Sequence, residues 1–473
     1  MQADRCSWSN HGVVKQSNSG LDLHVDLDRH RVRESLEGAL RDAVRSGRLP
    51  FGTLLPPSRA LAADLGVARA TVVDAYGQLV AEGWLDARQG SGTRVAAVGA
   101  PEPGRHRDPV ASPANTPYDF RAGRPDMSSF PRTEWVSAVR QVLLEMPASA
   151  LDYGDPRGRP ELRAALAAYL GRARGVRADP DAVVVCSGYA EALWLVGRAL
   201  HDVGVRDVAV EAFGHAQHRA VLADTGQRLH PLDVDDEGAA VGGWGDVGAA
   251  VLTPAHQFPL GWALSPRRRA EVLRWADDAD GFLVEDDYDA EFRYDRRAVG
   301  ALQPLAPGHV IHAGTTSKTL APAVRLSWLV LPEPLVDPVV ERRRLLGQQV
   351  PAIDQLALSH LITTTRYDRH VRRSRLAYAR RRAQLVGELA RHAPESRAVG
   401  LPAGLHSVVE LAPGDSEGDA IARARSRGVA VEGLATYSWV PGSAPPSLVV
   451  GWAAPPPHMW TSGLRRLCRA LAG

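Results

Sequence analysis

The strongest constraint on how this chain folds is a proline-rich stretch over residues 96–117. It holds five prolines in 22 residues. Proline fixes the backbone torsion φ and lacks the amide donor that helices and central strands need, so such a stretch is typical of a semi-stiff linker. We therefore expect four parts: a disordered leader over residues 1–27, a small domain over 28–95, the linker over 96–117 and a large domain over 118–473.

Composition places the chain among ordinary globular proteins: 45% of its 473 residues are hydrophobic and 23% are charged. Only three cysteines occur, far apart, which excludes a disulfide scaffold and a cysteine-based zinc site. No apolar run reaches the ~20 residues of a membrane span, and the N-terminal residues lack the apolar stretch of a signal peptide. We expect a bacterial cytoplasmic protein, associated with the nucleoid if it binds DNA. The net charge of +2 requires any DNA site to be a local patch.

Hydrophobic periodicity in the small domain predicts three short helices. Their expected inward residues are Val32, Leu36, Leu40 and Ala43 in the first, Leu61, Ala62 and Leu65 in the second, and Val72, Tyr76, Leu79 and Val80 in the third. Ser58 is expected to cap the second helix, which ends at Gly66. The third helix starts at Arg69, after a three-residue turn. This arrangement is typical of a helix–turn–helix, in which the start of the second helix of the pair contacts base edges; a plain helical bundle is the alternative.

A hairpin with a glycine-bearing tip is predicted after the third helix. Arginines on either side of the tip suit contacts to DNA phosphates. The motifs Leu54-Leu-Pro-Pro-Ser-Arg59, Gly66-Val-Ala-Arg69-Ala-Thr71 and Gly90-Ser-Gly92-Thr, in this order and spacing, resemble GntR-type winged helices. The resemblance implies a small α+β domain that binds double-stranded DNA with repeated half-sites. The DNA-contacting residues that we expect are Arg59, Arg69, Thr71, Arg88, Gly90 and Gly92.

The large domain alternates short β-branched runs with helical stretches. The runs lie at residues 181–185, 207–210, 249–252 and 281–284. Alternation of this kind is typical of an α/β domain with a parallel sheet and crossover helices. Ligands of such folds gather at the carboxyl ends of the strands, and the motifs that follow lie at these ends.

One lysine stands out in the large domain. The chain has 54 arginines and two lysines, Lys15 in the leader and Lys318. A buried lysine, unlike arginine, can become a neutral nucleophile. Lys318 could form a Schiff base with an aldehyde-bearing phosphate cofactor, whose phosphate Thr315, Ser317 and Arg325 would bind. An arginine-biased composition with one solvated lysine is the alternative explanation.

A strand that runs into Glu285-Asp286-Asp287 and Tyr288 suits a pyridine cofactor. A carboxylate beside the ring nitrogen keeps that nitrogen protonated, and the phenol could hydrogen-bond a ring hydroxyl. A divalent-metal site is the alternative for three adjacent carboxylates. Upstream, a strand leads through Gly188 into a helix, whose first N–H groups can bind phosphate. A proline-bounded loop carries His256, for which a structural role is the simpler explanation.

In this order and spacing, the motifs resemble fold-type-I pyridoxal 5'-phosphate (PLP) enzymes of the aminotransferase kind, beginning with Phe120-Arg-Ala-Gly-Arg-Pro-Asp and Tyr153-Gly-Asp. A GntR-type head, a linker and this domain together resemble MocR-type regulators. The resemblance implies PLP as the cofactor, no metal and a homodimer. It implies that Lys318 forms the Schiff base and that Asp286 pairs with the ring nitrogen. It also implies that Tyr288 hydrogen-bonds the ring hydroxyl and that His215 stacks on the ring. The residues that it implies at the phosphate are Gly188, Tyr189, Ala190, Thr315, Ser317, Arg325 and, from the neighbouring subunit, Tyr153.

Three positions depart from the enzymes' pattern. Val449 stands where they carry an arginine that binds the substrate carboxylate, and an apolar side chain cannot make those bidentate bonds. His215 replaces a commoner aromatic residue, and Phe258 stands where an asparagine usually bonds the ring hydroxyl. The cofactor residues are kept while the amino-acid anchor is lost, which favours a sensor over an efficient transaminase.

We therefore expect a DNA-binding transcriptional regulator whose large domain binds PLP through Lys318 and senses an effector. PLP itself or a small amine or amino acid is the expected effector, in the control of vitamin B6 or amine metabolism. The alternative is an active aminotransferase with a regulatory head. A dimerisation platform without cofactor is disfavoured because Lys318, Asp286, Tyr288 and Arg325 are all present.

Overall fold

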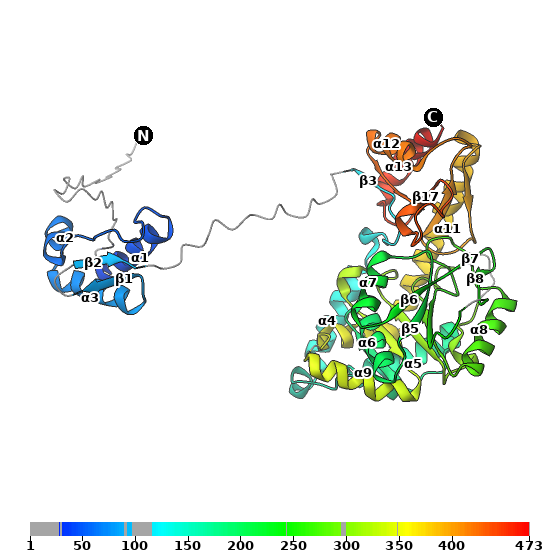
Figure 1. The fold of residues 1–473 in the computed structure, drawn as a ribbon, viewed down its shortest axis with the longest axis horizontal. Coiled ribbons are helices and arrows are strands. Elements are labelled where there is room, and N and C mark those ends of the chain that lie inside the picture. Colours follow the sequence, from blue (N-terminus) through cyan, green and yellow to red (C-terminus); the bar gives the residue numbers. More distant parts are fainter. Residues whose placement is uncertain are drawn as a thin grey trace, which may run out of the picture. The chain divides into compact units, whose positions relative to one another are not determined.

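The computed structural model describes residues 28, 31–88, 92–96, 116–242, 244–294, 299–347 and 349–472. Contacts divide the chain into two compact units, Met1–Ser112 and Pro113–Gly473, drawn in Figure 1 in blue and in cyan to red. In the described part of the chain, no helix is long and apolar enough to cross a membrane.

The small unit is a three-helix bundle with a two-stranded hairpin. Its elements are α1 (Val32–Arg45), α2 (Ser58–Leu65), α3 (Arg69–Ala81), β1 (Leu85–Arg88) and β2 (Gly92–Val95). The hairpin is antiparallel and pairs Arg88 with Gly92. All three helices bury apolar residues in one core, as the periodicity predicts. The predicted winged-helix fold of this part is confirmed.

Two details of the small unit differ from expectation. Pro57 holds the N-cap position of α2, and the side chain of Ser58 makes no capping hydrogen bond, because Ser58 already lies inside the first turn. Val80, expected to face inward, is 36% exposed, since it lies one residue beyond the buried Leu79 on α3. The predicted end of α2 is correct: Gly66 has φ +65°, a left-handed conformation that favours glycine.

The large unit is built on a seven-stranded sheet with the order β4-β12-β11-β10-β9-β5-β6. Its strands are β4 (Val183–Cys186), β5 (Asp207–Glu211), β6 (Arg228–Leu232), β9 (Ala249–Leu252), β10 (Phe282–Asp286), β11 (Val310–Thr315) and β12 (Ser327–Val330). The sequence predicts a parallel sheet with crossover helices. The sheet is mixed, because β12 runs antiparallel to both β11 and β4 while the other neighbouring strands are parallel.

Helices cover both faces of this sheet. The helices of this part are α4 (Arg132–Glu145), α5 (Pro160–Arg174), α6 (Tyr189–Asp202), α7 (Ala216–Asp224), α8 (Pro266–Asp278), α9 (Glu333–Leu346) and α10 (Ala352–Thr363). Val208 and Val210 of β5 pack in one core with α6 and α9, while Ala209 between them packs in another with α8. Side chains of a strand alternate between faces, so both faces of β5 must be apolar.

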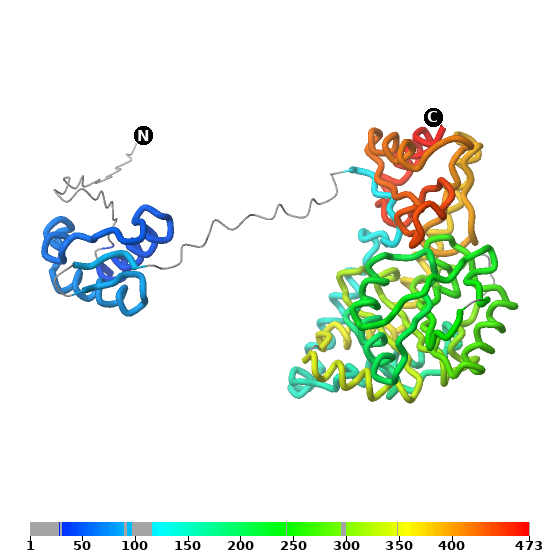
Figure 2. Tube along the Cα trace, viewed as in Figure 1, coloured from blue at the N-terminus to red at the C-terminus, as the bar shows by residue number. Residues whose placement is uncertain are grey.

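A smaller sheet, with the order β13-β14-β17-β16, forms the C-terminal part. Its strands are β13 (Arg397–Val399), β14 (His406–Glu410), β16 (Glu432–Gly433) and β17 (Ser447–Gly451), and its helices are α11 (Arg366–His392), α12 (Glu417–Ser426) and α13 (Pro457–Leu471). The chain enters this part first, since β3 (Tyr118–Asp119) pairs with β15 (Val429–Ala430), as Figure 2 shows where the cyan trace meets the orange one. Two short strands, β7 (Val234–Asp235) and β8 (Gly238–Ala239), form a separate hairpin.

Candidate functional site

A cavity of about 280 Å³ lies at the carboxyl ends of β5, β9, β10 and β11. Ligands of open α/β sheets bind at this edge. The cavity brings together most of the residues expected at the cofactor. Those that line it are Tyr189, Ala190, His215, Asp286, Tyr288, Thr315, Ser317, Lys318 and Arg325.

Lys318 follows β11 and reaches across the cavity to the N-terminal segment of the large unit. Its Nζ donates a hydrogen bond to the carbonyl oxygen of Gly123 at 2.6 Å. Burial lowers the pKa of Lys318, and the carboxylates of Asp289 and Asp286 oppose this effect. A lowered pKa raises the fraction of neutral amine, which is the nucleophilic form.

Asp286 ends β10 and faces the same cavity. Burial raises its pKa to about 8, although a hydrogen bond from Tyr189 and the charge of Lys318 oppose the shift. Desolvation disfavours the ionised carboxyl, and a cationic partner placed beside it would favour ionisation. The group is therefore suited to pair with a protonated ring nitrogen.

The other two carboxylates of the acidic run have different partners. Glu285 accepts hydrogen bonds from the backbone N–H groups of Leu302 and Gln303 at 2.7 and 3.1 Å. Asp287 forms a buried ion pair with Arg174 at 2.7 Å. Among the described residues, the donor atoms close enough to hold a metal ion belong to His256, Asp289 and His406, and the acidic run is not among them. The metal alternative for this run therefore gains no support.

His256 positions the phenol of Tyr288. Its Nδ1 lies 3.1 Å from the Tyr288 hydroxyl and 2.9 Å from Oδ2 of Asp289, so the ring is oriented by a carboxylate. His406, on β14, lies beside His256 with ring centroids 5.2 Å apart. Sequence reasoning missed Asp289 and His406 as parts of the site. Asp289 lies three residues after Asp286, so the polar residues that follow β10 could have indicated it. His406 lies in a distant part of the sequence, and no motif spacing links it to these residues.

Apart from Tyr153, the expected phosphate residues lie around the start of α6. Gly188 has φ +130°, and a Cβ there would lie 2.7 Å from a guanidinium nitrogen of Arg325, so only glycine allows this approach. Ser317 receives a hydrogen bond from the Thr315 hydroxyl at 3.0 Å. Arg325 itself has φ +55°, an unfavourable conformation for a non-glycine residue that is often found at functional sites. The group combines a helix N-terminus, two hydroxyls and a guanidinium.

An apolar wall borders the cavity on the side of the smaller sheet, where Phe258 and Tyr288 line it. Val449 is fully buried and packs in one cluster with Phe258, Tyr288 and Val408. The ring of His215 stacks on Phe258, with centroids 4.3 Å apart and planes 19° apart. Burial lowers the pKa of His215 to about 3, so the imidazole is neutral at physiological pH.

Two charged residues of the cavity were missed by sequence reasoning. Glu211 ends β5, and its carboxyl accepts hydrogen bonds from the N–H of Thr253 and from Gln257, each at 3.1 Å; burial raises its pKa to about 7. Glu211, like Asp286, is the last residue of its strand, and this position was the sequence signal that could have identified it as a residue of the site. Arg219, on α7, also lines the cavity, and its guanidinium lies 5.4 Å from the Trp439 ring.

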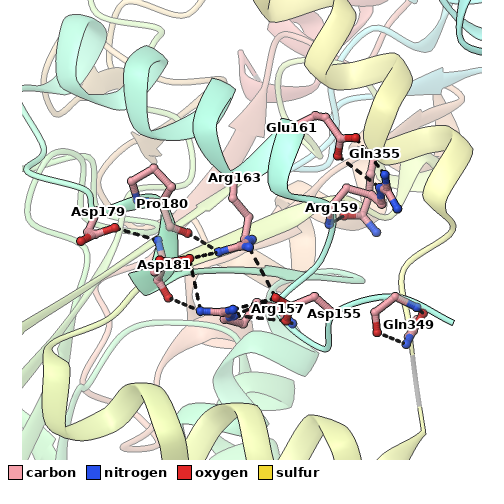
Figure 3. A network of polar contacts seen from close by, with 11 residues as sticks. Asp155, Arg157, Arg159, Glu161, Arg163, Asp179, Pro180, Asp181, Gln349 and Gln355 are labelled. Atoms are coloured by element: carbon pink, nitrogen blue, oxygen red, sulfur yellow. Dashed lines mark hydrogen bonds and ion pairs between the residues drawn. The ribbon is translucent and has the colours of Figure 1, made fainter. Parts of the chain in front are cut away.

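Tyr153 does not reach the cavity within one chain, since its side chain is 95% exposed. A polar network fixes the loop that carries it (Figure 3). Gln349 exchanges two hydrogen bonds with the backbone of Gly154, at 3.0 and 2.9 Å, and Arg157 pairs with Asp155 at 2.7 Å. These contacts tie the loop to the segment before α10, while its tyrosine is exposed to solvent.

In the small unit, Arg59 and Arg69 are exposed and Thr71 is half-buried. Arg88 is exposed and lies 3.3 Å from Asp86. Gly92 has φ +80°, and a Cβ there would approach Leu54 to 2.9 Å, so the hairpin needs glycine at this position. Gly90 lies outside the described residues, as do the leader and most of the linker.

Comparisons with known proteins agree with this division. Residues 32–95 match the family of bacterial regulatory proteins of the gntR type, and residues 119–433 match aminotransferase class I and II. In solved structures, an archaeal alanine:glyoxylate aminotransferase shares the fold, with a TM-score of 0.68 and 23% identity over 75% of this chain and 90% of its own. LysN, the α-aminoadipate aminotransferase of Thermus thermophilus, was solved with N-(5'-phosphopyridoxyl)-L-leucine. It shares the fold with a TM-score of 0.66 and is 25% identical, over 75% of this chain and 91% of its own.

The similar full-length proteins are regulators. The probable rhizopine catabolism regulatory protein MocR of Rhizobium meliloti is 33% identical over 79% of each chain. The pyridoxine biosynthesis transcriptional regulator PdxR of Corynebacterium glutamicum is 30% identical over 92% of this chain and 95% of its own. These relatives contain both parts of the chain, which favours a regulator over a purely catalytic protein. The chain belongs to the MocR-type transcriptional regulators, which join a GntR-family DNA-binding domain to an aminotransferase class I and II domain.

Proposed function

We propose that this regulator binds PLP in the cavity of its large unit and that occupancy of the cavity changes its affinity for DNA. One observation carries the proposal. Lys318 is the only lysine of the large domain, and it lines the same cavity as Asp286, Tyr288 and the residues around the start of α6. The donor set fits the group: an amine of lowered pKa, a carboxyl for the ring nitrogen, and a helix N-terminus with a guanidinium for the phosphate.

When bound, PLP supplies an aldehyde that reacts with amines and a ring that withdraws electrons. In this chain, Lys318 would provide the amine and Asp286 the charge partner of the ring nitrogen. Tyr288, oriented by His256, would bond the ring hydroxyl. Tyr189 and Ala190, through backbone N–H groups, and Thr315, Ser317 and Arg325, through side chains, would hold the phosphate. The N–H of Gly188 donates to the Ser327 hydroxyl at 3.0 Å, so Gly188 would contribute the close approach of its backbone to Arg325. His215, one face of which stacks on Phe258, would stack on the cofactor ring.

The apolar wall supports a sensor over an efficient transaminase. Val449 stands where the resemblance places the enzymes' carboxylate-binding arginine, and it packs in an apolar cluster with Phe258 and Val408. An α-amino acid would lose hydrogen bonds to charged groups that are worth ~1.5–3 kcal/mol each. Sustained turnover with an amino donor and an acceptor would support the enzyme alternative instead.

We also propose that the protein acts in the cytoplasm as a homodimer. Exposed apolar side chains support pairing of the large units: Val136, Leu143 and Leu144 on α4, Leu151 at the end of a short 3-10 helix (Ala148–Leu151), and Tyr153 after it. Val136, Leu143 and Leu144 line one surface groove, and exposed apolar surface of this kind marks an interaction site. Pairing would bring Tyr153 to the partner's cavity and hold two DNA-binding heads for repeated half-sites, with the gain in effective concentration that linkage gives.

The decisive experiment is an absorbance titration of the PLP-free protein with PLP, run alone and with DNA from the region upstream of its own gene. A new band at about 420 nm is the signature of a protonated Schiff base. The band together with a changed DNA affinity supports a cofactor-gated regulator. The band without such a change favours another effector or an enzyme, and no band at saturating PLP contradicts the proposal.

Replacement of Arg69 by alanine is expected to weaken operator binding roughly tenfold to a hundredfold, because a base-edge contact from the start of α3 is worth ~1–3 kcal/mol. The PLP band should not change, since the two sites lie in separate units. Electrophoretic mobility shift and absorbance titrations measure the two quantities. Arg48→Ala, at an exposed arginine outside α3 and the hairpin, is the matched control. Loss of both DNA binding and the PLP band in Arg69→Ala would contradict this modular arrangement.

A further inference from the structure

A second cavity, of about 410 Å³, lies where the end of α5, the segment after β10 and the start of α11 meet. Among the described residues, it has no lining residue in common with the cofactor cavity. Two acidic residues line it, against five arginines: Arg174, Arg293, Arg369, Arg372 and Arg375. The lining therefore carries more positive than negative groups.

Two of these charged groups have partners outside the cavity. Arg174 pairs with Asp287 at 2.7 Å, and Asp368 pairs with Arg172 at 2.9 Å. Because each of these pairs is neutral as a whole, the charge of the cavity depends on the other groups of its lining. Most of these are arginines of α11.

Three arginines of α11 follow one another at intervals of three residues: Arg369, Arg372 and Arg375. Residues three apart on a helix are neighbours, with Cβ atoms ~5–6 Å apart, and like charges at such positions repel. Arg369 donates to two backbone carbonyls at the start of its own helix, each at 3.4 Å. Arg372 and Arg375 form no ion pair with a carboxylate in the part of the chain that the structure describes. An anion in the cavity would relieve the repulsion among these groups.

The carboxyl of Glu291 opposes this positive charge only in part. It accepts a hydrogen bond from the Tyr169 hydroxyl at 3.3 Å. Burial, and to a smaller extent the charge of Asp287, raise the pKa of Glu291 to about 7. About half of such carboxyls are uncharged at pH 7, so the lining remains cationic.

We propose that this cavity binds a small organic phosphate, whose phosphate group the arginines of α11 hold. A guanidinium donates two parallel hydrogen bonds to a phosphate, and charge-assisted bonds of this kind are short and strong. The volume of about 410 Å³ falls within the ~300–1,000 Å³ typical of small-ligand sites. A DNA duplex could touch only the rim of such a cavity, so the ligand is a small molecule. The site is separate from the one proposed for PLP and does not depend on it.

Inorganic pyrophosphate is the probe, because it carries phosphate groups and no other functional group. We expect Arg372→Gln/Arg375→Gln to bind it roughly tenfold to a hundredfold more weakly than the wild type, since each hydrogen bond between charged groups contributes strongly to affinity. Arg373→Gln/Arg380→Gln is the matched control. It removes the same charge from exposed positions of α11 that do not line the cavity, and it should bind pyrophosphate as tightly as the wild type.

The measurement is isothermal titration calorimetry of the full-length, PLP-free protein at constant ionic strength, with hydrogen–deuterium exchange to locate the protected backbone. Protection of residues 365–375, together with a loss of affinity only in the cavity variant, supports the inference. Equal affinity in the two double variants overturns it, and so does protection confined to the start of α6, where the phosphate of PLP is expected. No binding at millimolar pyrophosphate also overturns it.

A mobility-shift titration with operator DNA distinguishes a small ligand from a DNA contact. Weaker DNA binding by Arg372→Gln/Arg375→Gln, with unchanged pyrophosphate affinity, overturns the inference in favour of a DNA contact at the rim. Circular dichroism checks the fold of each variant. If the double variant does not fold, Arg372→Gln alone, at an exposed position, provides the same test with a smaller expected loss.

Discussion

Replacing Lys318 with alanine is expected to abolish the absorbance band at about 420 nm that PLP should produce with the wild-type protein, because a Schiff base requires an uncharged primary amine and no other lysine lies in the large domain. The position of Lys318 supports this expectation: its Nζ lies in the cavity, and burial lowers its pKa. PLP should still bind weakly to the variant through its phosphate and ring nitrogen. Titration by absorbance and by fluorescence separates loss of the band from loss of binding.

Lys15→Ala is the matched control, since the chain has only two lysines, and its spectrum should equal that of the wild type. Reduction of the PLP-loaded protein with borohydride, followed by peptide mass analysis, should place the phosphopyridoxyl group on Lys318. An undiminished band in Lys318→Ala, or a label on another amine, would show that the site uses a different nucleophile.

Replacing Arg174 with alanine is expected to destabilise the large unit by ~3–5 kcal/mol, the cost of leaving one member of a buried ion pair without its partner. Arg174 ends α5, and its Nε and Nη2 donate to the carboxylate of Asp287 at 2.7 and 3.0 Å. The two side chains are only 7% and 3% exposed. Asp287 adjoins Asp286, so the pair also fixes the end of β10 at the cavity. Thermal and urea unfolding of the PLP-free protein measure the loss.

Arg172→Ala is the matched control for this prediction, two residues earlier on the same helix. Arg172 also pairs with an aspartate, Asp368, at 2.9 Å, but its side chain is 55% exposed. Exposed pairs contribute at most ~1 kcal/mol. Equal destabilisation by the two substitutions would mean that the buried pair has no special role.

The same ion pair predicts how stability depends on pH. Burial alone would raise the pKa of Asp287, but Arg174 and His312 outweigh it and hold the pKa below its ordinary value. A depressed pKa in the folded state contributes stability that is present above the unfolded pKa of about 4 and is lost as the pH falls through the folded value. Stability of the wild type should therefore decrease in acid more steeply than that of Arg174→Ala. Parallel pH profiles would contradict this assignment.

The order of the chain's parts followed from local sequence. The proline-rich stretch, the helical periodicity of α1 and α3 and the motifs around Arg59 and Arg69 all act over a few residues, and neighbouring residues alone fix such patterns. Strand-end glycines, carboxylates and the lone Lys318 also lie next to the strands that position them. For this reason the winged helix, the α/β domain and the common cavity could be anticipated, while the antiparallel direction of β12 could not, because strand direction depends on pairing between distant segments.

The side chains available at the carboxyl ends of the strands can be read from the sequence alone, because each of them directly follows an apolar run. Their partners depend on the packing of distant segments: Arg174 pairs with Asp287, and His256 contacts Tyr288 and Asp289. The physical reason is that a buried polar group must find a partner wherever the packed chain brings one. Those partners lie 32 to 113 residues apart in the chain, at separations over which residue spacing carries no information.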